Sequence, residues 1–574
     1  MLKILCLLLF AVSFLGYFHF LVNVKKVSIF AAPVIIVTSI CAIMCIAGLV
    51  NTMPVCVYMI LTIGIFLLLK YKSVFSVKAL SGNEFSLILC AALLVYLAYY
   101  TKGAVYADGD TMTHWGVIVK SIYRNGRLPN FTDLEIEYQA YPPATACWIF
   151  FALKLLGYSE ARALLAQALW MYTCVISMFA INKRRNKLGD ILIFLLSVYL
   201  LTGLDNLRVD VILSLVTIAA IVVLITEQND AKQMACFLAP FLFTIPLIKN
   251  SGILFACIPV CMAIGISTQQ NLRRQTWKTA GCGILIPIVS WYLWKAHTKM
   301  VYESADWTMH SFSSGSMKSI LSMKSEEDIY TILLTYIKKW FSFNDSHEWL
   351  AVILIALIGV IALLLCSRKK EVLFVSGVIM GFYLIYKVCL FLMYLLSMVG
   401  DEAFELASYE RYQQTFTMVM TFVALWLYFE FIQSLNTPVH ALVGKRACAC
   451  MLVLSCFGLC FERYPTLVRP NYAEGGIHRK LVSMIGTDDE MDVGDKVLTY
   501  HSYWLAYRLV QHSFDNYTCN STYDIEEIEE ALKTNKERYE WLIILEEDTQ
   551  IRMLLREYGY PDDVQAIPLI DWSE

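Results

Sequence analysis

Long apolar runs separated by short polar segments dominate the chain up to about residue 461. A helix that crosses a bilayer needs about 20 mostly apolar residues, with a range of about 17–25. By this measure the pattern predicts fourteen membrane-spanning helices, near 3–22, 27–49, 53–69, 85–100, 160–182, 188–204, 209–226, 233–248, 251–267, 279–295, 349–366, 372–397, 414–434 and 446–461. The expected fold class is an α-helical polytopic membrane protein.

The composition leads to the same class. Of the 574 residues, 58% are hydrophobic, 13% aromatic and only 16% charged, and the mean hydropathy is +0.58. Soluble domains are nearer 45–50% apolar and about 25% charged, so a water-soluble globular enzyme is excluded. The aromatic content excludes a disordered chain. A net charge of −2 leaves no basic footprint for nucleic acid.

The 18 cysteines do not form a recognisable disulfide framework. Nearly all of them lie inside apolar runs, and Cys519 is the one in a clearly polar segment. A disulfide framework needs paired cysteines in an oxidising compartment. We therefore expect most of these cysteines to be small apolar core residues.

Lysine and arginine clusters predict the orientation, because cytoplasmic loops carry an excess of these residues. With fourteen spans and the N-terminus outside, every such cluster falls on the cytoplasmic side: Lys25-Lys26, Lys70/Lys72/Lys78, Lys183-Arg184-Arg185 with Lys187, Arg273-Arg274 with Lys278, Arg368-Lys369-Lys370 and Lys445-Arg446. The first run lacks a small-x-small exit and continues into Lys25, so a retained span is expected rather than a signal peptide.

The apolar segment 142–157 opens with two prolines and is short for a span. Counting it as a span would put the 183–185 cluster outside, so we expect a helix lying in the outer interface. The topology then leaves three long outer segments, 101–159, 296–348 and 462–574.

The segment 462–574 is predicted to be a separate extracytoplasmic α/β domain, beside a transmembrane domain over 1–461. It contains about twice as many acidic as basic residues. Its pattern predicts two strands and two helices: a strand at Lys496–Tyr500, a helix at Ile525–Ala531, a strand at Trp541–Leu545 and a helix at Thr549–Glu557.

The first outer segment contains a compact group of candidate catalytic residues: Asp108, Asp110, His114 and Trp115. A carboxylate at the membrane surface can take a proton from an attacking hydroxyl group. The same residues also fit an Asp-Gly-Asp turn that caps the following helix, predicted over 111–125. The sequence leaves both interpretations open.

A second charged motif, Arg208-Val-Asp210, begins the predicted span 209–226. Charge is expensive inside a membrane, so such residues face a cavity or a partner. The alternative is that Asp210 is a helix N-cap and Arg208 its headgroup anchor.

Three cations complete the candidate chemistry. Lys249 and Arg411 lie on predicted outer turns, where either could bind a lipid phosphate. Snorkelling to ordinary headgroups is the alternative for Lys249, and an ion pair with Glu410 or Glu405 is the alternative for Arg411. Lys387, inside the span 372–397, could equally pair with an acidic group in the bundle.

In their order along the chain, the motifs of residues 85–574 resemble those of the GT-C superfamily of polytopic glycosyltransferases, which use sugars linked to lipid phosphates. The resemblance rests on Asp108 and Asp110, Asp110 to Trp115, Tyr141-Pro142-Pro143, Arg208-Val209-Asp210, Lys249 to Gly252, Glu410-Arg411-Tyr412 and the small closing domain. Members commonly have one span before the acidic loop, whereas this chain has four predicted.

The resemblance implies inverting transfer of a sugar from a polyprenyl-phosphate donor to an acceptor on the outer face of the cell membrane. Asp110 would be the general base, with Asp108 as the alternate, because Gly109 between them leaves the choice open. Asp210 would orient the acceptor or a metal. Lys249 and Arg411 would hold the donor phosphate.

The other residues that the resemblance places at substrate are His114, Trp115, Tyr141 and Arg208. The implied partners are membrane lipid, the lipid-linked sugar and a glycan, glycolipid or protein acceptor, with no nucleic acid. Participation of a divalent cation stays open, because some members need one and others do not.

Two other functions are compatible with the sequence: a transporter or flippase for a lipid-linked glycan, and a surface-polymer polymerase or ligase. Transporters tend to show inverted repeats and broken helices near the middle of the membrane. Here the acidic residues gather at one predicted face, which favours an enzyme.

Overall fold

The structure is a computed structural model of the chain. It describes residues 2–72, 80–106, 108–133, 136, 138–227, 231–269, 273–302, 314–342, 346–433, 439–470, 496–500, 518–522, 524–534, 539, 541–544, 549–561, 564 and 566–569.

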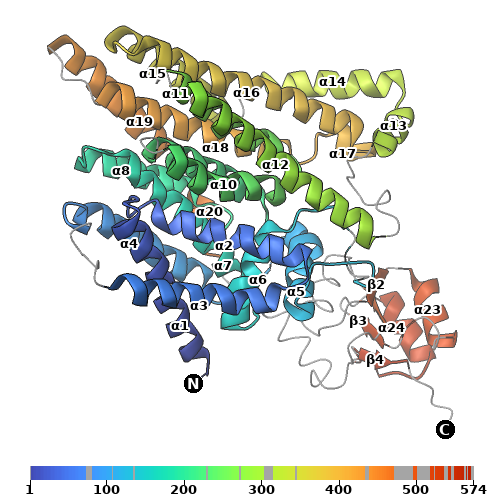
Figure 1. The fold of residues 1–574 in the computed structure, drawn as a ribbon. Coiled ribbons are helices and arrows are strands. Elements are labelled where there is room, and N and C mark those ends of the chain that lie inside the picture. The colour runs from blue at the N-terminus through green and yellow to red at the C-terminus, as the bar shows by residue number, and fades with distance from the viewer. Residues whose placement is uncertain are drawn as a thin grey trace.

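Each of the fourteen apolar runs coincides with a helix of the described chain (Figure 1). These helices are α1 (Leu2–His19), α2 (Ala32–Leu49), α3 (Met53–Tyr71), α4 (Glu84–Thr101), α7 (Glu160–Ser177), α8 (Lys187–Leu200), α9 (Asp210–Thr226), α10 (Ala231–Ile248), α11 (Gly252–Gln269), α12 (Arg273–Val301), α15 (Ser346–Leu365), α16 (Lys369–Leu396), α18 (Tyr409–Leu427) and α19 (Val439–Glu462). Shorter helical elements connect them: η1 (Phe20–Val24), η4 (Thr111–Trp115), α5 (Gly116–Asn125), α6 (Ala144–Leu156), η5 (Met178–Ile181), α13 (Ser314–Ser322), α14 (Glu326–Trp340), α17 (Gly400–Phe404), η7 (Tyr428–Gln433) and α20 (Tyr464–Leu467).

Within the described residues, eight helices are long and apolar enough to cross a membrane: α1, α2, α3, α4, α7, α15, α16 and α18. α9, α10, α11 and α19 contain shorter apolar stretches. Prolines lie inside two of these, at Pro240 and Pro246 in α10 and at Pro259 in α11. The chain is therefore a helical protein with several candidate spans, and the number fourteen stays a prediction.

The segment expected to lie at the outer interface forms the 13-residue helix α6. A helix at the interface would expose one face to solvent or headgroups, but most side chains of α6 are buried. They are buried because α6 packs against α2, α5 and α7. Trp148 donates a hydrogen bond from Nε1 to the Ala166 carbonyl of α7 at 2.7 Å. α6 is thus part of the protein core.

α9 lies at the centre of the bundle. Every residue from Ile212 to Ile225 is buried, and α9 packs against α7, α10, α11 and α18. A helix that is apolar all round either lies in the core of a large protein or spans a membrane, and the burial of α9 shows that it lies in the core of this bundle. In contrast, α3 and α4 expose large apolar side chains such as Phe66 and Val95, which suits contact with lipid. The first turn of α9 therefore places the carboxylate of Asp210 in the interior of the bundle.

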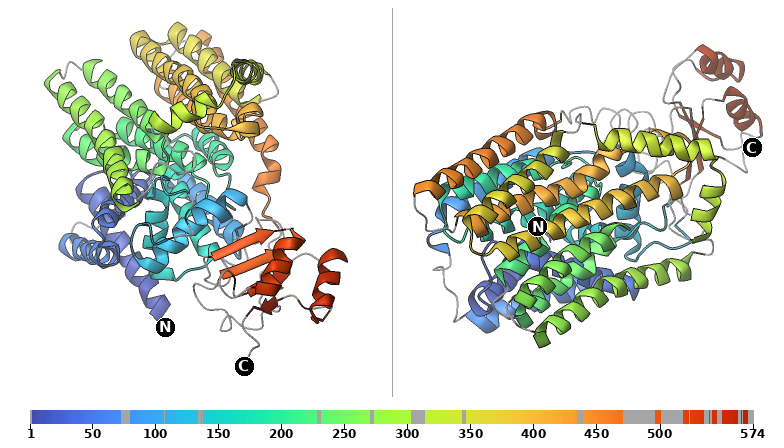
Figure 2. Two further views of the ribbon diagram at one scale, coloured as in Figure 1. Left: turned by 90° about the vertical axis from the view of Figure 1, so that its right-hand side faces the viewer. Right: turned by 90° about the horizontal axis from the view of Figure 1, so that it is seen from above.

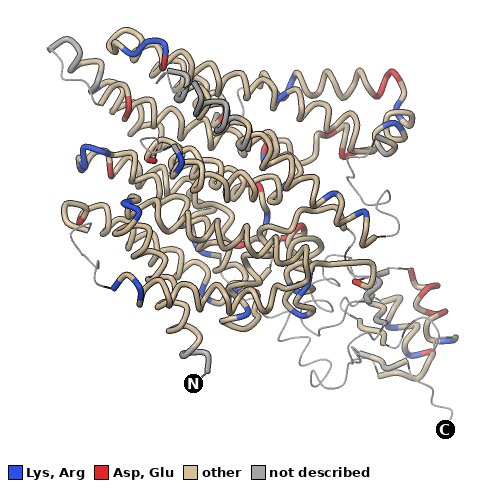
Figure 3. Tube along the Cα trace, in the orientation of Figure 1, with Lys and Arg blue, Asp and Glu red and all other residues tan. Residues whose placement is uncertain are grey.

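Two of the basic clusters of the sequence lie at one end of the bundle. Figure 3 shows blue stretches where α8 and α16 begin, at the left of the view. α8 follows the 183–187 cluster, and α16 follows the 368–370 cluster. Lys183 and Arg368 both contact Glu430, so the two clusters lie on the same side of the bundle, as the predicted orientation expects.

The described residues from 496 onward include a four-stranded sheet with its own core. The strands are β1 (Lys496–Tyr500), β2 (Thr518–Thr522), β3 (Trp541–Ile544) and β4 (Ala566–Pro568), in the order β2-β1-β3-β4. β1 is parallel to β2 and β3, and β4 is antiparallel to β3. Helices α23 (Ile525–Thr534) and α24 (Thr549–Glu557) pack on the sheet through side chains such as Leu498, Leu542, Ile528 and Leu555. Figures 1 and 2 show this unit beside the end of the bundle near α5.

Candidate functional site

The structure brings together the six charged residues that the sequence analysis selected from the two acidic motifs and the outer turns. They come from four places in the chain: Asp108 and Asp110 at the start of η4, Arg208 and Asp210 at the start of α9, Lys249 between α10 and α11, and Arg411 in the first turn of α18. Each carboxylate contacts at least one of the cations. Three acidic and three basic side chains thus form one charge-balanced cluster.

Asp108 has a mainly structural environment. Its Oδ2 accepts a hydrogen bond from the Thr111 amide at 3.1 Å and another from the Thr111 hydroxyl group, and its Oδ1 contacts Arg208 Nη2. The first bond is the helix-capping bond that the alternative interpretation expected. Both oxygens of Asp108 are therefore engaged, and its side chain is 18% exposed.

Asp110 is less committed. Its Oδ2 contacts Arg411 Nη1 and lies 3.5 Å from Arg208 Nε, and its side chain is 31% exposed. Burial alone would raise the pKa of Asp110, but the charges of Arg411, Arg208 and His114 and the hydrogen bond from Arg411 outweigh it, so the pKa lies below its ordinary value. Asp110 is accordingly an ionised carboxylate with an accessible oxygen.

Asp210 does not act as a helix cap. The residue before it, Val209, is the N-cap of α9, and no side-chain capping bond is present there. Instead, Asp210 Oδ1 accepts a hydrogen bond from Lys249 Nζ at 2.5 Å, and Oδ2 lies 3.6 Å from Arg411 Nε. A buried carboxylate needs such partners because its desolvation is costly.

Arg411 joins the two acidic motifs, since its guanidinium reaches both Asp110 and Asp210. The local ion pair with Glu410 or Glu405 is not the contact observed. Lys249 and Arg411 also lie beside the ring of Tyr412, at 4.2 Å and 5.2 Å from its centroid. Such contacts orient the two cations without neutralising them.

A second layer of hydrogen bonds positions the turn before α9. The Leu207 amide donates to Thr111 Oγ1 at 2.9 Å, which links the two acidic motifs. Gln167 of α7 donates from Nε2 to the carbonyls of Asn206 and Arg208, at 3.1 and 3.3 Å. This turn is therefore held against both η4 and α7.

Aromatic rings lie next to the charged cluster. The ring centroids of His114 and Tyr138 are 3.5 Å apart, and Trp115 stacks on Tyr141 at 4.9 Å. Trp294 of α12 donates to the carbonyl of Ala140 at 3.2 Å, so α12 supports this loop from outside. Burial raises the pKa of Tyr141 well above its ordinary value, so its hydroxyl group stays neutral. Tyr138 was missed by the sequence analysis, although its spacing from Tyr141 could have suggested it.

A divalent cation does not fit these residues as they stand. Among the described residues, no group of three or more His, Cys, Asp or Glu side chains is arranged to hold a metal ion. Each of the three carboxylates of the cluster already faces a lysine or arginine, whose positive charge opposes a bound cation.

Lys387 pairs with an acidic residue inside the bundle, which is one of the possibilities that the sequence left open. Its Nζ lies 2.6 Å from Glu348 Oε1, and both side chains are only 1% exposed. Glu348 was missed by the sequence analysis. The available signal was an isolated acidic residue at the start of an apolar run, in front of Trp349.

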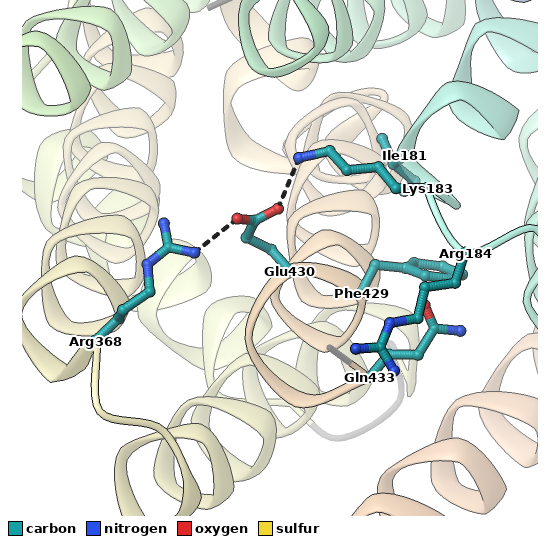
Figure 4. Close-up of a pocket in the computed structure, with 7 residues that line it drawn as sticks. All are labelled: Ile181, Lys183, Arg184, Arg368, Phe429, Glu430 and Gln433. Atoms are coloured by element: carbon teal, nitrogen blue, oxygen red, sulfur yellow. Dashed lines mark hydrogen bonds and ion pairs between the residues drawn. The ribbon is translucent and has the colours of Figure 1, made fainter. Parts of the chain in front are cut away.

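A separate charged cavity of about 240 Å³ lies at the other end of α18, around η7 (Figure 4). Figure 4 shows Lys183 and Arg368 reaching Glu430 from opposite sides, at 3.2 and 2.8 Å. Glu430 is 19 positions after Arg411 in the chain. At a rise of about 1.5 Å per residue, the two lie about 28 Å apart along the helix, close to the roughly 30 Å thickness of a bilayer core.

Comparisons with known proteins gave two similar solved structures. One is the crystal structure of ArnT from Cupriavidus metallidurans in the apo state, with a TM-score of 0.48 and 10% sequence identity, covering 85% of this chain and 98% of that chain. The other is ArnT from Cupriavidus metallidurans bound to undecaprenyl phosphate, with a TM-score of 0.43 and 10% identity, covering 85% of this chain and 99% of that chain. ArnT is a GT-C glycosyltransferase. No family model and no curated protein sequence matches the chain.

Proposed function

We propose that this protein is a membrane glycosyltransferase that moves a sugar from a polyprenyl-phosphate donor to an acceptor on the outer face of the membrane. One observation carries the proposal: the continuous chain of contacts Asp110–Arg411–Asp210–Lys249. It combines an accessible ionised carboxylate with two cations at the end of a bundle of candidate membrane helices. These are the groups that a transfer from a lipid phosphate requires.

The cations would bind the donor phosphate. An arginine fork can make two parallel hydrogen bonds to phosphate oxygens, and a lysine supplies a mobile point charge. As the bond between the anomeric carbon and the phosphate oxygen breaks, negative charge builds up on that oxygen. Arg411 and Lys249 would stabilise this charge where it develops.

Asp110 would be the general base. The acceptor hydroxyl oxygen attacks the anomeric carbon from the side opposite the phosphate, so the transfer inverts that centre. Its proton passes to Asp110, the new glycosidic bond forms, and polyprenyl phosphate leaves with the electron pair of the broken bond. Asp108 is the weaker candidate, because both of its oxygens already accept hydrogen bonds or ion pairs.

Donor binding would also activate the base. In the structure Arg411 contacts Asp110 and thereby lowers the pKa of its carboxyl group, which makes it a poor proton acceptor. A donor phosphate competes with Asp110 for the same guanidinium. When Arg411 turns toward the phosphate, Asp110 loses its strongest stabilising charge, its pKa rises, and its basicity increases. Proton abstraction is then favoured only when donor is bound.

The aromatic loop supplies an acceptor surface. The rings of His114, Tyr138 and Tyr141 are partly exposed near Asp110, whereas Trp115 is buried and stacks on Tyr141 from behind. A partly exposed flat ring suits the apolar face of a sugar. The acceptor hydroxyl would lie between this surface and Asp110. Arg208, which contacts both Asp108 and Asp110, would orient the base rather than bind donor.

The direct test is incubation of the purified protein with radiolabelled polyprenyl-phosphate sugars and a membrane extract as acceptor source. We expect one donor to be consumed, with release of polyprenyl phosphate and transfer of label to the acceptor. Asp110→Asn should slow transfer by about 10²- to 10⁴-fold while still binding the lipid phosphate. Absence of transfer with every donor, or movement of intact labelled lipid across a vesicle membrane, would overturn the proposal in favour of a transporter.

A further inference from the structure

A buried ion pair lies behind the charged cluster, and the proposed chemistry does not use it. Glu348, at the start of α15, and Lys387, in the middle of α16, are 2.6 Å apart and almost fully buried. Replacing such a pair by apolar residues is often neutral or stabilising. Stability alone is therefore a weak explanation for two opposite charges at this depth.

Both members of the pair are bonded to the first turns of α18. Lys387 Nζ donates to the hydroxyl oxygen of Tyr409 at 3.0 Å, and Glu348 Oε2 accepts a hydrogen bond from Gln413 Nε2. Tyr409 and Gln413 are four residues apart and therefore share one face of the helix. Arg411 is two residues from each, about 200° around the axis, so it points the opposite way. The pair holds one face of α18 while the other face presents Arg411 to Asp110 and Asp210.

α16 also holds the backbone around Arg411. Tyr386 donates from its hydroxyl group to the carbonyl of Tyr412 at 2.6 Å, and Tyr394 donates to the carbonyl of Ala407 at 2.9 Å. The turn that leads into α18 contains Leu406 and Ser408 with φ of 54° and 59°. Residues other than glycine rarely adopt this left-handed conformation, and it persists where the surroundings impose it.

We infer that Glu348 and Lys387 are positioning residues for donor binding: with Tyr409 and Gln413 they set the rotation and height of the first turns of α18, and so the place of the Arg411 guanidinium. This inference rests on the proposed function, because it assigns the pair a role in placing the phosphate-binding arginine. A shift of about 1 Å in such a group can cost on the order of 100-fold in rate.

The sharpest test compares two variants that each remove one buried hydroxyl group from the same cluster. Tyr409→Phe removes the oxygen that Lys387 holds on α18. Tyr336→Phe removes a hydroxyl group that donates to the carbonyl of Lys387 on α16 at 2.6 Å, and it keeps the ring that contacts Tyr409. We expect Tyr409→Phe to weaken binding of polyprenyl phosphate and raise the donor KM about tenfold, with a smaller change in kcat. Tyr336→Phe should leave both constants at the wild-type value.

A second set of variants separates positioning from stability. Glu348→Gln and Lys387→Met each leave one buried charge unpaired, and both should lower the melting temperature. The double variant removes both charges and should recover the wild-type melting temperature. Its donor KM should nevertheless be higher than that of the wild type, because the contacts that position α18 are changed. Recovery of the melting temperature together with wild-type donor binding would overturn the inference, as would equal behaviour of Tyr409→Phe and Tyr336→Phe. If the wild-type protein neither binds polyprenyl phosphate nor transfers sugar, the proposed function fails and this inference fails with it.

Discussion

The charged cluster contains three aspartates in three different environments: Asp108, Asp110 and Asp210. Asp108 is committed to the Thr111 amide and to Arg208, and Asp210 is paired with Lys249 in a largely buried position. Asp110 alone among the three combines substantial exposure with a cation that a phosphate can draw away. The division of roles among the three therefore follows from their neighbours.

Asp110→Asn should lower kcat by about 10²- to 10⁴-fold, because the amide keeps the shape of the side chain but cannot accept a proton. Asp108→Asn should behave differently, with a smaller loss of rate and a loss of stability of at most about 1 kcal/mol, because asparagine caps a helix as well as aspartate does and only the partly exposed pair with Arg208 is lost. Turnover assays and thermal melts on both variants measure these effects. Normal turnover of Asp110→Asn would remove it from the role of base.

The pH dependence tests the coupling between donor binding and Asp110. The pKa of Asp110 is lowered from 3.8 in the folded protein. Its contact with Arg411 therefore contributes full stability above about pH 4 and is lost as the pH falls through the lowered pKa. The profile of kcat/KM reports the free enzyme and that of kcat the donor complex. We expect the acidic limb of kcat to lie at higher pH than that of kcat/KM, and coincident limbs would argue against displacement of Arg411.

Arg411→Lys should raise the donor KM strongly, because one ammonium group cannot reach Asp110 and Asp210 and also give a phosphate two parallel hydrogen bonds. Lys249→Ala should raise KM and leave the buried Asp210 carboxylate with Arg411 as its remaining cation of the charged cluster. Measurement of KM and kcat with one lipid-linked sugar distinguishes binding of the donor phosphate by these two cations from simple anchoring to lipid headgroups. Anchoring predicts that donor kinetics stay unchanged in both variants.

At the level of helices and strands, the sequence predicted what depends on local length and pattern. All fourteen apolar runs are helical, and the strand expected at Lys496–Tyr500 is β1 with the same bounds. Local pattern failed where partners are distant. For Arg411 it offered Glu410 or Glu405, yet the observed partner Asp110 is 301 residues away. Which helix ends meet depends on packing throughout the bundle, and no local spacing encodes it.

The two ends of α18 provide a matched comparison within one element. Glu430→Gln removes the bridge between Lys183 and Arg368, whose side chains are 56% and 46% exposed. Exposed ion pairs contribute about 0.2–1 kcal/mol each at most, so we expect a small decrease in the melting temperature. Donor KM should not change, since Glu430 lies about 28 Å from Arg411 along the helix. A rise in KM equal to that of Arg411→Lys would show that the effect is not local to the charged cluster.

For the whole molecule, the orientation in the membrane decides whether the proposed chemistry faces the outside. The sheet β2-β1-β3-β4 lies near the end of the bundle that carries α5 (Figure 1), and the basic clusters before α8 and α16 lie at the other end (Figure 3). By the preference of Lys and Arg for the cytoplasm, the charged cluster and the residues after 462 are predicted to be extracytoplasmic.

Cysteine labelling in intact cells tests this orientation. Cys519 lies in β2 of the C-terminal unit. Among the described cysteines, the exposed ones are Cys236, Cys389 and Cys450. They lie on the apolar helices α10, α16 and α19, where lipid would shield them from a membrane-impermeant reagent. We expect the reagent to label the wild-type protein from outside and to lose that signal in Cys519→Ser. Labelling of Cys519 only after permeabilisation, with the denatured protein confirming a reactive thiol, would invert the orientation. The acceptor would then have to be cytoplasmic, because the aromatic loop and Asp110 lie at the same end of the bundle as this unit.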